Sequence, residues 1–318
     1  MSMRTFNPKV SVIIPTIGRK SLKDAIESVV NQTYKNLEII ITDDTENEKA
    51  KSKIEKYLKD QRIKYVVNKK YKHGPAGNRN NGLDCVTGEY FTFLDDDDVL
   101  FPNAIEELLK CALEKNCKIV FANCIDNVKK EFTGKHYGKS EMVFYKDMLC
   151  GKFEGEYCGL NKTSLLNGER FNDECWGGEW ILWMKLWKKA QYGFYLHKPL
   201  KVYSIETLDR VTNLMVKKAE KTYLNYTLFL ESFGKDLILN CPKVYVRHSL
   251  RGIYFAKLAG KYREVLKLYF NSLKACPKLF LLPTLWAMFC LITPKFLVFK
   301  IYESFLEKFK GEMKRFLK

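Results

Sequence analysis

Short runs of hydrophobic residues alternate with amphipathic stretches over the first 122 residues of the chain. Short apolar runs ended by turn residues are typical of buried strands, whereas apolar residues spaced three and four apart indicate helices. The spacing of Ser21 and Asp24 predicts an acidic capping box at the first helix. This pattern predicts strands at 10–14, 37–41, 63–67, 90–94 and 118–122, and helices at 21–31, 48–58, 76–86 and 102–115.

Strands that alternate with helices predict an α/β fold whose mostly parallel sheet carries helices on both faces. Beyond residue 122 we expect a helix at 178–191, two short strands within 193–204 and an almost wholly helical chain from Val211 onward. We therefore predict a first domain at 1–210, with a nucleotide-binding half at about 8–122 and an acceptor half at about 123–210. A helical C-terminal region would follow at 211–318.

Polar residues follow three of the predicted strands. The first strand is followed by Pro15-Thr16-Ile17-Gly18-Arg19, the second by Asp43-Asp44, and the fourth by four aspartates, Asp95–Asp98. Sheets of this type bind ligands at the carboxyl ends of their strands. Carboxylates this close together favour a bound cation or raised pKa values, and oxygen ligands without His or Cys favour Mg²⁺ or Mn²⁺. The alternative is that the aspartates form a solvated loop.

The charge of the chain is concentrated near its end. The 318 residues carry a net charge of +17, and Cys241–Lys318 holds sixteen Lys/Arg against four Asp/Glu. A nearly neutral body with a basic, apolar tail favours a membrane surface over nucleic acid as the partner. The ten cysteines include no C-x-x-C pair, and the N-terminus has no apolar signal region. We therefore expect a cytosolic protein with mostly buried free thiols.

Four segments carry a family resemblance. They are Val10–Arg19, Leu37–Asp44, the Gly74-x3-Asn78-Arg79-Asn80-x-Gly82 pattern and Gly88–Asp98. In this order and spacing, the chain resembles family 2 glycosyltransferases, which have the GT-A fold and transfer a sugar from a nucleotide donor. The matching segments cover roughly residues 8–122.

The resemblance implies roles for individual residues. It implies that Asp95 and Asp97 form the D-x-D motif, with Asp95 near the ribose and Asp97 on Mn²⁺ or Mg²⁺. Asp96 would occupy the variable position of this nucleotide-sugar site, and Asp98 would support it. The remaining nucleotide-sugar contacts implied by the family are Pro15, Thr16, Arg19, Asp43 or Asp44, and Arg79.

An inverting transferase also needs a general base for the acceptor hydroxyl. The family places an Asp where this chain has Glu179, so the resemblance implies Glu179 as the catalytic base. The alternative for Glu179 is an acid favoured by the dipole at a helix start. Trp176 and Trp180 are candidates for stacking on an acceptor sugar. Arg210 is the best candidate for a phosphate contact in a loop that departs from the family pattern.

The C-terminal region contains an uncharged apolar segment, 279–294, followed by a basic amphipathic pattern at 301–317. Sixteen residues fall short of the about 20 that a membrane-spanning helix needs. We expect this region to lie at an anionic membrane surface. The alternative is a helical bundle whose apolar faces pack on one another.

Together these features predict a metal-dependent inverting glycosyltransferase, peripheral on the cytoplasmic face of the membrane. Its donor would be a nucleotide sugar with UDP as the expected nucleotide, and its acceptor a growing polyprenyl-linked glycan. The alternatives are a non-catalytic membrane- or nucleic-acid-binding module and a nucleotidyltransferase. Nucleic acid is disfavoured because the aspartate-rich edge would repel phosphate.

Overall fold

The structure is a computed structural model that describes residues 7–205, 214–298 and 300. The chain divides into two compact units. The first takes the described residues up to Asp173 and those from Leu182 to Ile205, and the second takes Glu174–Ile181 and those from Leu214 onward. The predicted domain boundary at 210/211 lies outside the described residues.

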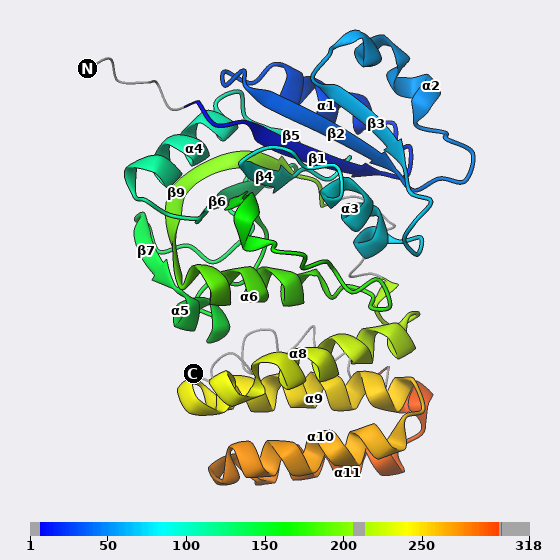
Figure 1. Cartoon of the computed structure of the whole chain (residues 1–318). Coiled ribbons are helices and arrows are strands. Elements are labelled where there is room, and N and C mark those ends of the chain that lie inside the picture. Colours follow the sequence, from blue (N-terminus) through cyan, green and yellow to red (C-terminus); the bar gives the residue numbers. More distant parts are fainter. Residues whose placement is uncertain (1–6, 206–213, 299, 301–318) are drawn as a thin grey trace. The chain divides into compact units, whose positions relative to one another are not determined.

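Within the described residues, the first unit contains one nine-stranded mixed sheet (Figure 1). Its order is β3-β2-β1-β4-β8-β6-β9-β5, and β7 pairs with β9. The strands from β3 to β4 are parallel, whereas β8 is antiparallel to both of its neighbours. The strands are β1 (Val10–Thr16), β2 (Leu37–Asp43), β3 (Ile63–Val67), β4 (Tyr90–Phe93), β5 (Val99–Leu100), β6 (Ile119–Asp126), β7 (Glu141–Phe144), β8 (Tyr157–Lys162) and β9 (Tyr192–Tyr203).

Helices cover both faces of this sheet, as the sequence predicts. One core packs α1 and α4 against one face, and a second core packs α3 and α6 against the other. The helical segments associated with this unit are α1 (Leu22–Val30), α2 (Lys51–Ile54), the 3₁₀ helix η1 (Glu55–Lys59), α3 (Pro75–Leu83), α4 (Ala104–Glu114), α5 (Tyr145–Leu149), the 3₁₀ helix η2 (Thr163–Leu165) and α6 (Glu179–Ala190).

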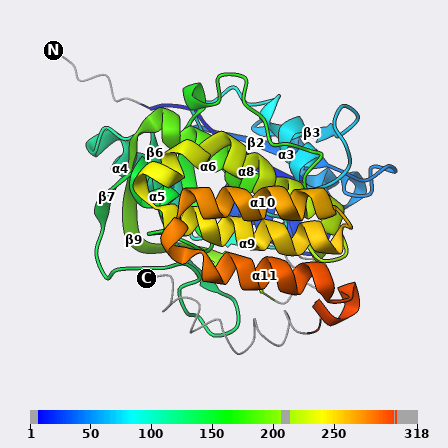
Figure 2. The ribbon, with the colours of Figure 1, turned by 90° about the horizontal axis from the view of Figure 1, so that it is seen from below.

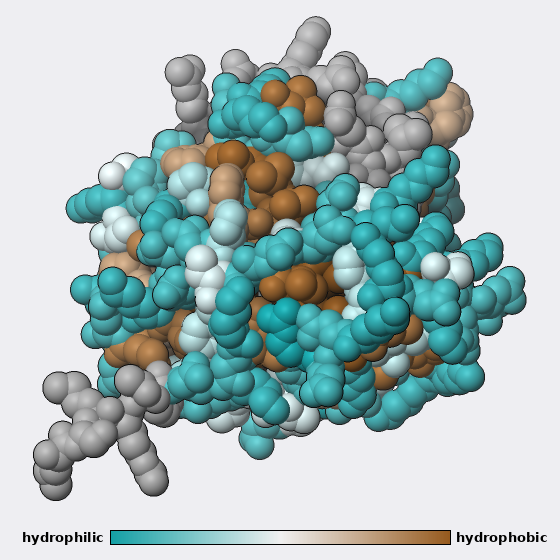
Figure 3. Space-filling model, turned by 90° about the horizontal axis from the view of Figure 1, so that it is seen from above, coloured by the Kyte–Doolittle hydropathy of each residue, from teal (hydrophilic) through white to brown (hydrophobic). Residues whose placement is uncertain are grey.

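Both cores are built mainly from aliphatic and aromatic side chains. Cys111, Cys117, Cys124 and Cys158 are buried free thiols in this unit. Hydrophilic side chains dominate the face shown in Figure 3, interrupted by smaller hydrophobic areas. Among the described residues of this unit, the buried charged side chains are Asp43, Asp96, Asp98, Asp126 and Lys201.

Three local predictions were wrong. Ser21 precedes α1 in a helical conformation and makes no side-chain cap, so the expected capping box is absent there. The predicted helix at 48–58 is split into α2 and η1, and in these two segments only Ile54 is buried. Residues 193–204 form most of one long strand, β9, because a register shift against β6 accommodates Pro199 without ending the strand.

The second unit contains α8 (Ala219–Asn240), α9 (Pro242–Leu258), α10 (Tyr262–Ala275), the 3₁₀ helix η3 (Pro277–Leu279) and α11 (Leu281–Ile292). Figure 2 looks onto α9, α10 and α11, which run side by side. The helical character that the sequence predicts is confirmed. Among the described residues, no helix combines the length and apolarity needed to cross a membrane. The predicted helix at 301–317 lies outside the described residues.

Candidate functional site

Asp96 joins the aspartate turn to the end of β1. Its Oδ2 accepts hydrogen bonds from the Thr16 hydroxyl at 2.5 Å and from the Ile17 amide at 3.3 Å. Its Oδ1 forms an ion pair with Arg19. Burial raises the pKa of the Asp96 carboxyl, and the charge of Arg19 opposes this shift. The structure thus shows Asp96 and Arg19 bound to each other at this sheet edge.

Asp95 stands at the start of the same turn and pairs with α3. Arg79 Nη2 lies 2.6 Å from Asp95 Oδ1, and the Asp95 side chain is 36% exposed. Burial works against ionisation of Asp95, but the charges of Arg79, Lys201 and Arg19 outweigh it and hold the pKa below its ordinary value. Asp95 is therefore an ionised carboxylate with access to solvent.

Asp98, the last residue of the aspartate turn, is buried and contacts the end of β9. Its Oδ2 lies 2.7 Å from Lys201 Nζ, and its Oδ1 accepts the Ser204 amide at 3.0 Å. Lys201 also lies 3.2 Å from Glu156, although the lysine side chain is only 4% exposed. Burial raises the pKa of Asp98 against the opposing charge of Lys201. This ion pair fastens the aspartate turn to the end of β9.

Sequence reasoning missed Lys201. The signal was a lysine within the apolar run Leu200-Lys201-Val202 of a predicted strand. A buried lysine is rare unless it is paired, so that position could have been matched to an acid at the sheet edge. The negative charges of the aspartate run are thus partly neutralised by Arg19, Arg79 and Lys201. The density of carboxylates is therefore not by itself an argument for a bound metal ion.

Asp43 and Asp44 lie at the end of β2. Parallel pairing places Asp43 opposite Thr16. Asp43 accepts hydrogen bonds from the Tyr65 hydroxyl at 2.7 Å and from two backbone amides. Asp44 accepts the Gly74 amide at 2.7 Å and the Asn68 side chain at 2.7 Å. Both carboxylates therefore shape the loops around the expected base-binding position.

The pattern around α3 has a structural explanation. Asn78 receives a hydrogen bond from Thr42 and donates one to the Thr16 carbonyl, which ties α3 to β2 and β1. A Cβ on Gly82 would lie 2.4 Å from an Ile13 methyl, so only glycine lets the helix approach the sheet this closely. This packing presents Arg79 to Asp95.

The residues at this edge fit a divalent ion completed by its substrate. The described residues contain no group of three or more His, Cys, Asp or Glu side chains arranged to hold a metal. Mg²⁺ is usually bound by one or two carboxylates together with substrate phosphates. Asp97 is partly exposed between Asp96 and Asp98, and Asp95 is partly exposed as well. Both side chains offer the carboxylate oxygens that such an ion prefers.

Glu179 belongs to the second unit by its packing, although it begins helix α6. The segment around it is fixed on α8, where Asn225 donates to the Trp176 carbonyl and the Trp176 amide contacts the Lys221 carbonyl at 3.4 Å. A Cβ on Gly178 would lie 2.5 Å from Asn225 Oδ1, which explains the glycine before Glu179. The helical unit therefore sets the backbone position of Glu179.

Trp180 completes this attachment. Its ring lies 4.1 Å from the Phe229 ring and is stacked at 5.2 Å on His248, measured between centroids. Its indole N–H donates to the Gly177 carbonyl at 3.0 Å. Trp180 is thus a packing residue of the helical unit, and its contact with an acceptor sugar stays a prediction. Arg210 lies outside the described residues.

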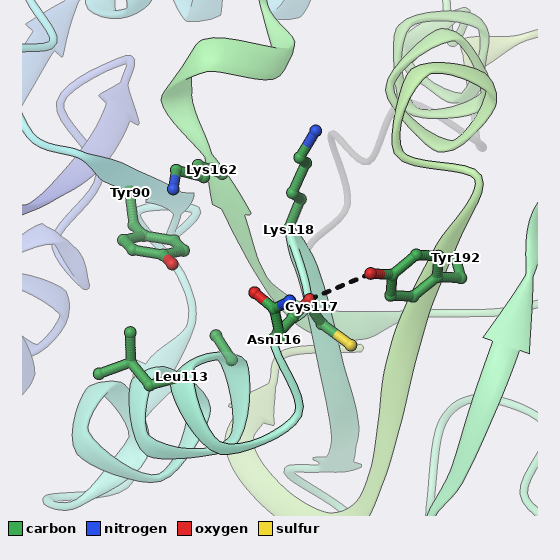
Figure 4. A pocket seen from close by; sticks show the side chains of 8 residues that line it. Tyr90, Leu113, Asn116, Cys117, Lys118, Lys162 and Tyr192 are labelled. Atoms are coloured by element: carbon green, nitrogen blue, oxygen red, sulfur yellow. Dashed lines mark hydrogen bonds between the residues drawn. The ribbon is translucent and has the colours of Figure 1, made fainter.

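A cavity of about 270 Å³ lies at the opposite edge of the sheet (Figure 4). Tyr90 begins β4 and lines this cavity, whereas Asp95 follows the end of the same strand. Lys118, Lys162 and Tyr192 also line it. The cavity is therefore distinct from the aspartate edge, and we do not assign the donor to it.

Comparison with known proteins shows the family of this chain. The family model for glycosyl transferase family 2 matches residues 11–167. A GalNAc(5)-diNAcBac-PP-undecaprenol beta-1,3-glucosyltransferase of Campylobacter jejuni is 41% identical over 276 residues, covering 84% of this chain and 88% of that protein. WfgD of Escherichia coli, a UDP-Glc:alpha-D-GlcNAc-diphosphoundecaprenol beta-1,3-glucosyltransferase, is 30% identical over 138 residues, covering 43% of this chain and 54% of WfgD.

Solved structures share the fold. TarS of S. aureus (residues 1–349, in complex with UDP-GlcNAc) superimposes with a TM-score of 0.59 and 16% identity, covering 84% of this chain and 88% of that chain. At this identity the likeness concerns the fold alone. It confirms the predicted GT-A architecture.

Proposed function

This chain belongs to glycosyl transferase family 2, and on that premise we propose that it adds a β-1,3-linked glucose to a polyprenyl-diphosphate-linked oligosaccharide. The chain is a glycosyltransferase. The observation that carries the finer proposal is the 41% identity, over most of both chains, to the Campylobacter jejuni undecaprenol-linked glucosyltransferase. The donor in this proposal is UDP-glucose, which agrees with the nucleotide sugar in the name of WfgD.

The donor would bind at the aspartate edge of the first unit. We assign the nucleotide to the loop Pro15–Arg19, Asp43, Asp44 and Arg79, and the sugar-phosphate side to Asp95 and Asp96. Asp97, with Asp95, would hold Mn²⁺ or Mg²⁺. Such an ion would neutralise the charge that develops on the diphosphate leaving group. The partly exposed carboxylates of Asp95 and Asp97 support this assignment.

We propose that Arg79 also orients Asp95. Its ion pair fixes one oxygen of Asp95, which leaves the second oxygen for other contacts. Lys201 and Asp98 form a buried ion pair behind the turn, so we assign them to holding the turn and not to contact with the donor. Charged groups that are already fixed in place need little rearrangement as charge develops in the transition state, which lowers the activation free energy.

We assign the general base to Glu179. In the proposed reaction, the acceptor hydroxyl oxygen attacks C1 of the donor sugar as Glu179 takes the hydroxyl proton. The bond between C1 and the diphosphate oxygen breaks, and UDP leaves with that electron pair. Attack opposite the leaving group inverts the anomeric centre, so an α-linked donor yields a β-linked product. General base catalysis contributes roughly 10²–10⁴-fold to such a step.

We place the protein at the cytoplasmic membrane face, where a polyprenyl-linked acceptor would be presented. The basic, apolar C-terminal region supports this location. Trp176, Trp180 and Arg210 remain candidate contacts of the acceptor. The nucleic-acid alternative is disfavoured by the four consecutive aspartates at the sheet edge.

The direct test is transfer of labelled glucose from UDP-glucose to a polyprenyl-diphosphate-linked oligosaccharide by the purified protein. We expect a lipid-extractable product whose new bond is cleaved by a β-1,3-specific glucosidase. Transfer from another UDP-sugar but not from UDP-glucose would contradict the assigned donor. An α-linked product would contradict the inverting mechanism.

A further inference from the structure

Helices α10 and α11 expose large apolar side chains to solvent. On α11, Leu281 and Leu285 are 59% and 57% exposed, and Ile292 is 79% exposed. Scattered apolar residues are normal on a protein surface, but a contiguous apolar patch marks an interaction site. We call the following set the apolar face: Leu281, Leu285, Met288 and Ile292 on α11, with Tyr262, Leu266 and Phe270 on α10.

The spacing shows that the apolar face is one side of each helix. The exposed residues of α11 recur at intervals of four, three and four, whereas its buried residues are Pro283, Ala287 and Cys290. On α10 the exposed apolar residues recur every four positions. A contact of 3.2 Å between the Tyr269 and Thr284 hydroxyls joins the two helices. The buried side of α11 thus packs within the unit, whereas the apolar face is exposed among the residues that the structure describes.

Basic residues flank the apolar face. Between Tyr262 and Lys300 the chain has six basic residues and one acidic residue, Glu264. Lys274 and Lys278 precede α11 and Lys295 follows it, and all three are exposed. Helix α11 itself carries no charge. Apolar side chains beside lysines match the interface of an anionic bilayer, where lipid tails meet negative headgroups.

We infer that the apolar face of α10 and α11 is the surface by which this protein inserts into an anionic lipid bilayer. This inference deepens the membrane location proposed above and rests on that proposal for its biological purpose. The occupant is the bilayer rather than a second copy, because a self-pairing face would bring the flanking lysines of both copies together. α11 would lie in the plane of the interface, since it is too short to span the bilayer.

The test is co-sedimentation of the full chain with phosphatidylcholine vesicles, with and without phosphatidylglycerol. The apolar variant combines Leu285→Ser, Met288→Ser and Ile292→Ser. The matched control combines Met142→Ser and Phe144→Ser on β7, which are also exposed, at 37% and 57%. We expect the wild type and the control to bind anionic vesicles equally, and the apolar variant to bind at least about tenfold more weakly.

A charge variant, Lys274→Gln/Lys278→Gln/Lys295→Gln, should lose about tenfold in affinity for anionic vesicles and little for neutral ones. UDP titration of each variant reports on the proposed function separately, and we expect unchanged UDP affinity. Undiminished vesicle binding by the apolar variant would overturn the inference. The inference would also be overturned if light scattering showed that the wild type is a dimer and the apolar variant a monomer.

Discussion

Thr16 Oγ1 lies 2.5 Å from Asp96 Oδ2, and this hydrogen bond links the end of β1 to the aspartate turn that follows β4. The two residues are 80 positions apart in the chain and both are buried. Arg19 pairs with the other oxygen of Asp96. Neighbouring aspartates of this edge therefore have different partners: Asp96 binds Thr16 and Arg19, whereas Asp95 binds Arg79.

Asp96→Asn should destabilise the fold. The change removes the negative partner of Arg19 and costs about 2 kcal/mol, less than the roughly 3–5 kcal/mol of a fully buried pair, because Arg19 is partly exposed. Thr16→Val should cost about 1–3 kcal/mol, because it removes the hydrogen bond to the buried Asp96 and the one that the Thr16 hydroxyl accepts from the Gly18 amide. Urea unfolding monitored by circular dichroism measures both. Unchanged stability of Asp96→Asn would show that the Arg19 pair is not formed in solution.

Lys201→Met should be more damaging, by about 3–5 kcal/mol, because it leaves Asp98 buried without its cation. The loss should grow as pH rises. Burial raises the pKa of Asp98 to about 7 in the wild type, and loss of the Lys201 charge should raise the pKa of this carboxyl further. Above about pH 7 the wild type ionises Asp98 beside Lys201, whereas the folded variant must keep the proton or bury an unpaired charge. The free energy of unfolding of the variant should therefore keep falling with pH where that of the wild type has levelled off. Adding Asp98→Asn to Lys201→Met should restore part of the stability. Additive losses in this double-mutant cycle would mean that the two residues do not interact.

Glu179→Gln should lower kcat by about 10²-fold or more while leaving UDP affinity unchanged, because the amide cannot accept the hydroxyl proton. The matched control is Glu174→Gln, an exposed acid of the same segment. We expect near-wild-type turnover for the control. If Glu179→Gln also turns over normally, the base is another residue.

Trp180→Ala should weaken the attachment of the Glu179 segment to the helical unit. Loss of the contacts with Phe229 and His248 should cost about 3 kcal/mol of stability, and kcat should fall because Glu179 is adjacent. Trp180→Phe keeps a ring in this position and should retain most activity. The control is Trp286→Ala, which removes a hydrogen bond to the Leu250 carbonyl within the same unit. Equal losses of kcat in Trp180→Ala and Trp286→Ala would point to general unfolding.

Much of the fold follows from local sequence pattern. The strand at Ile63–Val67 has the bounds that the sequence predicts, and β1, β2 and β4 end within two residues of their predicted ends. These strands are short apolar runs ended by polar or turn residues, so the local sequence is enough to predict their positions. The same reasoning placed Thr16, Asp43 and the aspartates on one edge, and the register of β1 with β2 confirms the neighbourhood of Thr16 and Asp43.

Features that depend on distant partners were not predicted. The need for Gly178 comes from Asn225 on α8, and the burial of Lys201 is tolerated because Asp98 and Glu156 lie beside it. None of these three partners is close in sequence to the residue that it contacts. The prediction divided residues 193–204 into two short strands, whereas a register shift against β6 lets β9 continue through Pro199.

The central claim is a metal-dependent UDP-sugar site at the aspartate edge. Calorimetric titration of the purified protein with UDP, with and without Mn²⁺, tests it most directly, with Asp97→Asn as the variant. We expect micromolar binding that requires Mn²⁺, prefers UDP over other nucleoside diphosphates and is lost in Asp97→Asn. Metal-supported UDP binding that persists undiminished in Asp97→Asn would contradict the assigned ligand, and the absence of nucleotide binding would contradict the site itself.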